Sequence, residues 1–115
     1  MNTKGHIVRL QQLYFDIEDL TGYNPHHLIM MVLLKSNYHK IVQQLFKRSP
    51  VIFDNLFHIG LAEIDDHMVN VRNAITKSER NRCFSDLQFY FQQSVLDARS
   101  KLLQIAQTKS DLQSH

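Results

Sequence analysis

The sequence contains little glycine, proline or cysteine and no tryptophan: its 115 residues include three Gly, two Pro and one Cys. Such low Gly and Pro content excludes a collagen-like chain and a low-complexity linker. A single cysteine excludes a disulfide scaffold and a zinc site built from cysteine pairs. The lone Cys83 is typical of a protein kept in a reducing compartment.

An excess of charge of one sign is also missing. Thirteen Lys and Arg face eleven Asp and Glu, which gives a formal net charge of +2, and 43% of the residues are hydrophobic. This balance excludes an intrinsically disordered segment and a polybasic tail. Because one domain commonly holds about 100 to 150 residues, we expect residues 1–115 to form a single domain.

No hydrophobic run is long enough to cross a membrane. The longest one covers residues 28–34, whereas a transmembrane helix needs about 20 residues. The beginning of the chain also lacks the apolar segment of a secretory signal. We therefore expect a cytoplasmic protein without a membrane partner, and we expect residues 28–34 to form a fully buried helix end.

Apolar residues recur every three or four positions along four segments, which predicts four helices. The first covers residues 7–20, and Gly22 is placed to take the left-handed conformation just after it. Asn24 and Pro25 predict the start of the second helix, because an asparagine cap followed by proline is a common helix start. This helix extends to Arg48.

Ser49 and Pro50 repeat that signal and predict a third helix, whose apolar residues from 57 to 75 follow alternating steps of four and three. Ser78 predicts a turn or kink, and a fourth helix carries apolar residues from 84 to 105 and frays after Thr108. We predict an all-α fold, an antiparallel four-helix bundle. The alternative is three long helices, with the last two continuous through Ser78. The residues expected in the core are Ile7, Leu10, Leu13, Tyr14, Ile17, Leu20, Met31, Leu34, Tyr38, Ile41, Leu45, Phe57, Leu61, Ile64, Met68, Val71, Ile75, Phe84, Leu87, Phe91, Val95, Ala98, Leu102 and Ile105.

A second apolar row runs along the fourth helix. Phe89, Leu96 and Leu103 are seven residues apart and project away from the predicted core face. Val8 and Phe15 have the same relation on the first helix, and antiparallel packing would place Val8 level with Leu103. Since monomers seldom expose large apolar patches, this surface predicts a homo-oligomer, most simply a dimer, or a protein partner. The alternative is that the chain's own helices bury the row.

Charges are also sorted by position. If the helices alternate in direction, one end of the bundle receives an excess of Lys and Arg and the other an excess of Asp and Glu. A basic end can engage an acidic protein or the phosphates of a nucleic acid. The residues expected at this basic end are Arg9, Lys40, Lys47, Arg48 and Lys101.

No constellation for catalysis, metal binding or cofactor binding stands out. The closest to a metal motif is the pair Glu63 and His67, whose spacing is more simply that of an exposed pair one helical turn apart. Asp54 and His58 have the same spacing. Cys83 has no histidine within a few residues and is expected to be a small buried hydrophobic residue. We therefore expect neither an enzyme nor a metal or cofactor site.

Two functions from different classes remain. The first is a small non-enzymatic interaction module: an adaptor, an inhibitor of the immunity or antitoxin kind, a secretion chaperone or a regulatory subunit. It would act through the second apolar row. The alternative is a helical nucleic-acid-binding subunit that uses the basic end.

Overall fold

The computed structural model describes the backbone of residues 2–113 and the side chains of residues 2–108. This part of the chain is almost entirely helical and contains no strand, which confirms the predicted all-α bundle. Consecutive helical segments are α1 (Thr3–Glu18), α2 (Pro25–Arg48), α3 (Pro50–Asn55), the π-helical turn η1 (Leu56–Gly60), α4 (Leu61–Asn73) and α5 (Lys77–Gln113).

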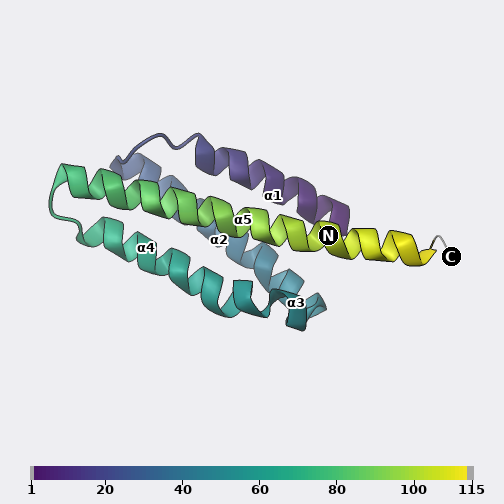
Figure 1. Cartoon of the computed structure of the whole chain (residues 1–115). Helices are drawn as coiled ribbons and strands as arrows, with labels where there is room; N and C mark the ends of the chain where they lie inside the picture. Colours follow the sequence, from purple (N-terminus) through teal and green to yellow (C-terminus); the bar gives the residue numbers. More distant parts are fainter. Residues whose placement is uncertain (1, 114–115) are drawn as a thin grey trace.

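The long helix α5 lies beside both α1 and α4, and it extends past the N-terminal end of α1 (Figure 1). In this view α1 and α5 run in opposite directions. Two hydrogen bonds fit that arrangement: Gln92 Nε2 donates to the carbonyl oxygen of Tyr14 (3.3 Å), and Gln88 Nε2 donates to that of Ile17 (2.7 Å).

The predicted helix start at Asn24 and Pro25 is confirmed. Asn24 Oδ1 accepts a hydrogen bond from the backbone N–H of His27 at 2.7 Å, and α2 begins at Pro25. Gly22 has a φ of +79°, the left-handed conformation predicted after the first helix. At Ser49 the predicted boundary is also correct, although the Ser49 side chain makes no capping hydrogen bond.

The turn before α5 lies earlier than predicted. α4 ends at Asn73 and α5 begins at Lys77. The last two helices are therefore separate, and the alternative in which they form one continuous helix is wrong. Thr76 Oγ1 accepts from the backbone N–H of Glu79 (3.1 Å), and Glu79 Oε2 accepts from that of Ile75 (3.3 Å). This reciprocal pattern is close to a capping box, which satisfies N–H groups that have no partner inside the helix.

The π-helical turn lies where α3 passes into α4. Leu56 and Leu61, both buried, are five residues apart, and in a regular α-helix they would point about 140° away from each other. The N–H of Leu61 donates to the carbonyl oxygen of Leu56, an i to i+5 bond that widens the turn. The wider turn brings Phe53 and Leu56 onto the core side together with Leu61.

The core agrees with the predicted apolar positions, with a few differences. Ile7, Tyr14, Phe57 and Ile105 are only half-buried, and Ile75 is 85% exposed because α4 has already ended before it. The expectation that residues 28–34 form a fully buried helix end is wrong. Ile29 and Leu33 are more than half exposed, because no other helix covers the outer side of α2 there.

Candidate functional site

The five apolar residues predicted as an interface all lie on the surface. Their exposed fractions show that the chain's own helices do not bury this row, and none of the five belongs to the buried core. They are Val8 (59%), Phe15 (49%), Phe89 (66%), Leu96 (37%) and Leu103 (41%). We call these five residues the α1/α5 apolar row.

The two helices bring the two halves of the row together. Phe15 of α1 and Leu96 of α5 line the same surface hollow of about 260 Å³. The hydrogen bond from Gln92 to Tyr14 sets the level of the helices. Val8, six residues before Tyr14, is therefore near the level of residue 98, between Leu96 and Leu103. Helical periodicity alone predicts that Val8 lies level with Leu103, because it does not reveal the glutamine contacts that set the register.

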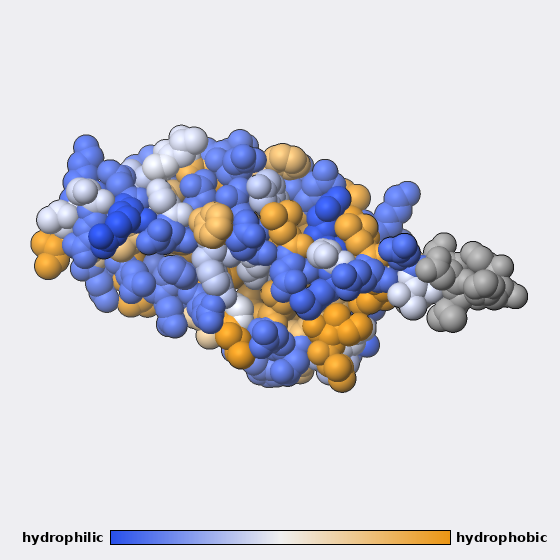
Figure 2. Space-filling model, viewed as in Figure 1, coloured by the Kyte–Doolittle hydropathy of each residue, from blue (hydrophilic) through white to orange (hydrophobic). Residues whose placement is uncertain are grey.

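The residues that separate the members of the row are polar, and one of them, Arg99, is charged. Gln11 on α1, and Gln93 and Ser100 on α5, are exposed. Figure 2 shows this pattern as hydrophobic atoms alternating with hydrophilic ones along α5, with a larger hydrophobic area over the region of α3. Arg99, half-buried, lines the hollow beside Leu96.

The five basic residues assigned to one end of the bundle lie in different surroundings. Lys47 and Arg48 are exposed at the end of α2, where an Arg48 guanidinium nitrogen donates to Thr3 Oγ1 at 3.4 Å. Lys101 is paired with Asp97 at 2.8 Å.

The other two basic residues line different hollows. Arg9 lies in a hollow between α1 and α2 together with Asp16. Lys40 lies in a groove between α2 and α4 together with Lys35 and Arg72.

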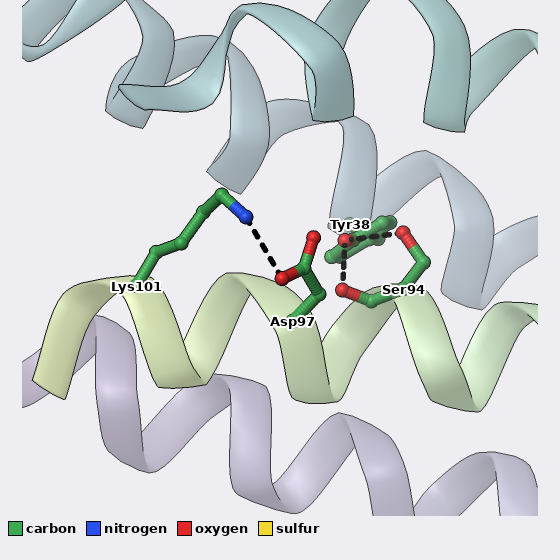
Figure 3. Close-up of polar contacts among 4 residues, drawn as sticks. All are labelled: Tyr38, Ser94, Asp97 and Lys101. Carbon is green, nitrogen blue, oxygen red and sulfur yellow. Dashed lines mark hydrogen bonds and ion pairs between the residues drawn. The ribbon is translucent and has the colours of Figure 1, made fainter. Parts of the chain in front are cut away.

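A buried polar contact between α2 and α5 is not predicted from the sequence. The Tyr38 hydroxyl, fully buried on α2, donates to the carbonyl oxygen of Ser94 on α5 (2.9 Å) and lies 2.7 Å from Ser94 Oγ (Figure 3). Burial raises the pKa of Tyr38 well above its ordinary value, although the hydrogen bond to Ser94 acts in the opposite direction. Ser94 could have been noticed because it occupies a core-facing position between Phe91 and Ala98.

Beside this contact, a hollow of about 280 Å³ opens between η1, α4 and α5. Its rim carries Glu63, whose carboxylate accepts a hydrogen bond from the Tyr90 hydroxyl. Desolvation and the Glu63 carboxylate together raise the pKa of Tyr90 to about 12. Glu63 thus accepts a hydrogen bond from Tyr90 on another helix. The ring of His67, its expected partner, packs against Tyr90, with the two ring centroids 5.0 Å apart.

The histidines are dispersed. His6 is buried, with Nε2 3.0 Å from Gln44 Oε1. His58 Nδ1 lies 2.9 Å from Asp54 Oδ1 on the surface, the expected pair one helical turn apart. Among the described side chains no three His, Cys, Asp or Glu residues are grouped closely enough to share a metal ion. Cys83 is half-buried against the core.

No family model, no curated protein and no solved structure matches the chain. Over the described residues, no helix combines the length and apolar character needed to span a bilayer.

Proposed function

We propose that this protein is a non-enzymatic interaction module that pairs with a second copy of itself through the α1/α5 apolar row. The observation that carries the proposal is the exposure of all five apolar side chains on two neighbouring helices. Burying apolar surface is the main favourable term in most protein association. An adaptor, an inhibitor, a secretion chaperone or a regulatory subunit would use the resulting dimer to present its remaining surfaces.

The chemistry of the row favours a second copy as the occupant. A twofold contact brings the same patch against itself, so a patch of one charge sign would repel its copy. Gln11, Gln93 and Ser100, between the apolar members, are uncharged, and the one cation there, Arg99, is half-buried beside Leu96. Interfaces are likewise poor in Lys, Asp and Glu, whereas Arg is common in them. The seven-residue spacing of Phe89, Leu96 and Leu103 also suits packing against another helix.

Sedimentation equilibrium of the whole chain at micromolar concentration tests the proposal. The natural protein is expected to sediment as a dimer, and Phe89→Ser and Leu96→Ser are expected to be monomeric with unchanged helical circular dichroism. Leu33→Ser is the matched control, because Leu33 is a similarly exposed leucine on the outer side of α2. A natural protein that is monomeric at this concentration, or dimers that survive both substitutions, would contradict the proposal.

The second candidate is a nucleic-acid-binding subunit, favoured by the adjacent exposed cations Lys47 and Arg48 at the end of α2. Binding through such cations weakens steeply as salt rises, because phosphate contacts release counterions. Replacing both residues with Gln is expected to lower the slope of log affinity against log salt by about 2 for duplex DNA. An unchanged slope would exclude this end of α2 as the site.

A further inference from the structure

The bundle has an open seam between α2 and α4. The two helices lie close together near α3 and separate toward the opposite end of the molecule, where α2 lies beside α1 and α4 turns into α5 (Figure 1). The seam is a groove of about 570 Å³, and an ion pair of 3.0 Å between Lys35 of α2 and Asp65 of α4 spans it. We refer to it as the α2/α4 groove.

The walls of the groove carry an excess of positive charge. Lys35, Lys40 and Arg72 line it together with one carboxylate, that of Asp65, which is already paired with Lys35. Lys40 and Arg72 are exposed, and no ion pair forms at either of them among the described side chains. The groove therefore offers two cations that are free to meet negative charge.

The groove also exposes apolar surface. Val69 on α4 is 46% exposed, and Val32 on α2 is half-buried. The α2 wall is formed by Val32, Ser36, His39 and Gln43, which recur in steps of four and three. These residues span about 16 Å at 1.5 Å per residue, the length of three helical turns. A groove of this length, with the apolar side chains of Val32 and Val69 and two free cations on its walls, can accept one face of a short amphipathic helix.

We propose that the α2/α4 groove binds an acidic amphipathic helix of a partner protein. The apolar face of that helix packs on Val32 and Val69, and its carboxylates meet Lys40 and Arg72. A second copy is a poor occupant, because a twofold contact would bring these cations against one another. A nucleic acid would satisfy the cations but would place phosphates against apolar side chains. This site is separate from the α1/α5 apolar row and does not depend on it.

Fluorescence anisotropy with a designed probe tests the proposal. The probe is a labelled helical peptide of about fourteen residues, with leucine on one face and glutamate on both flanks. Its counterpart carries lysine in place of glutamate. The glutamate peptide is expected to bind, the lysine peptide is expected to bind at least about tenfold more weakly, and the double variant K40E/R72E is expected to reverse this order.

Control variants separate this site from the others. Lys4→Glu changes an exposed lysine on α1 outside the groove and is expected to leave the affinity for the glutamate peptide unchanged. Phe89→Ser tests independence from the α1/α5 apolar row, and is also expected to bind the peptide normally even if it is monomeric. Nuclear magnetic resonance mapping is expected to place the shifted amides around Val32, His39 and Val69.

Several outcomes would overturn the proposal. These are no measurable binding of the glutamate peptide at millimolar protein, equal binding of both peptides, or equal loss of binding in Lys4→Glu and in the double variant. A duplex oligonucleotide that displaces the peptide and loses affinity in K40E/R72E would replace the proposal with a polyanion site. Formation of larger assemblies through the groove in place of peptide binding would make a second copy the occupant.

Discussion

At the scale of single residues, the buried Tyr38 hydroxyl contributes to stability because it makes hydrogen bonds inside the core, both of them to atoms of Ser94. Tyr38→Phe removes these hydrogen bonds and leaves the Ser94 hydroxyl with one partner fewer. We expect the free energy of unfolding to fall by about 1 to 2 kcal/mol, measured by urea denaturation. Tyr23→Phe is the control: the half-buried Tyr23 ring packs edge-on against Phe84, and the expected change is within about 0.5 kcal/mol. Equal stability of Tyr38→Phe and the natural protein would contradict the prediction.

The same tyrosine predicts how stability depends on pH. Burial raises the pKa of Tyr38 above the value of about 10 that it has in the unfolded chain. Above that pH the unfolded state loses a proton that the folded state keeps, so stability falls as the pH rises toward the folded-state pKa. In Tyr38→Phe this contribution is absent, and its stability is expected to fall less steeply, by up to about 1.4 kcal/mol per pH unit.

Urea denaturation at a series of pH values between about 9 and 11 measures this difference. Tyr90, whose pKa is raised to about 12, is present in both proteins and its contribution cancels in the comparison. Parallel stability curves for the two proteins would show that Tyr38 does not titrate differently in the folded and unfolded states.

At the scale of elements, two capping side chains, Thr76 and Glu79, stabilise the turn before α5. Thr76→Ala removes the acceptor for the N–H of Glu79, and we expect a loss of about 1 kcal/mol in the free energy of unfolding. Ser78→Ala, at the position that the sequence predicted for the turn, changes an exposed residue inside the first turn of α5 and is expected to cost less than about 0.5 kcal/mol. Thermal unfolding of both variants measures the two losses. A larger loss in Ser78→Ala than in Thr76→Ala would contradict the prediction.

Replacing either of two glycines with alanine is expected to change the free energy of unfolding, in opposite directions. An added Cβ at Gly60 would lie 3.6 Å from Leu56 Cδ2 and 3.7 Å from Ser94 Oγ, which are ordinary contact distances. Gly60→Ala is therefore expected to stabilise the protein by roughly 0.5 to 1 kcal/mol through a less flexible unfolded chain. Gly22 has a positive φ, so Gly22→Ala is expected to destabilise it by about 1 kcal/mol. Chemical denaturation of each variant measures both, and equal signs would contradict the argument.

Element by element, the sequence predicts helix starts better than helix irregularities. Asn24 acts through its side chain on a backbone N–H three residues later, and Pro25 and Gly22 act through their own backbone, so these effects are local and visible in the sequence. The capping signal at Thr76 was also local, since Glu79 follows three residues later, but Ser78 was read in its place. The π-helical turn carries no comparable signal, because it arises where the core requires both Leu56 and Leu61.

Sites that depend on the separation of helices were harder to predict than exposed rows. The α1/α5 apolar row follows from helical periodicity alone, which gives the direction of each side chain relative to the core. The α2/α4 groove depends on how far α2 and α4 diverge, a property of packing at α3. The assumption of alternating helix directions therefore groups Lys40 with Lys47 and Arg48 at one end of the bundle, whereas Lys40 lines a groove together with Arg72.

At the scale of the whole molecule, the proposed dimer makes thermal stability depend on concentration. When the folded state is dimeric and the unfolded state is monomeric, mass action stabilises the dimer as the protein is concentrated. A hundredfold increase in protein concentration above the dissociation constant stabilises the folded state by about 1.4 kcal/mol per protomer, which raises Tm by up to roughly 5 °C. We expect this rise in the natural protein and in Leu33→Ser, and no rise in Phe89→Ser or Leu96→Ser. A Tm that is independent of concentration in all four proteins would show that unfolding is not linked to self-association, and therefore that the α1/α5 apolar row does not hold two copies together.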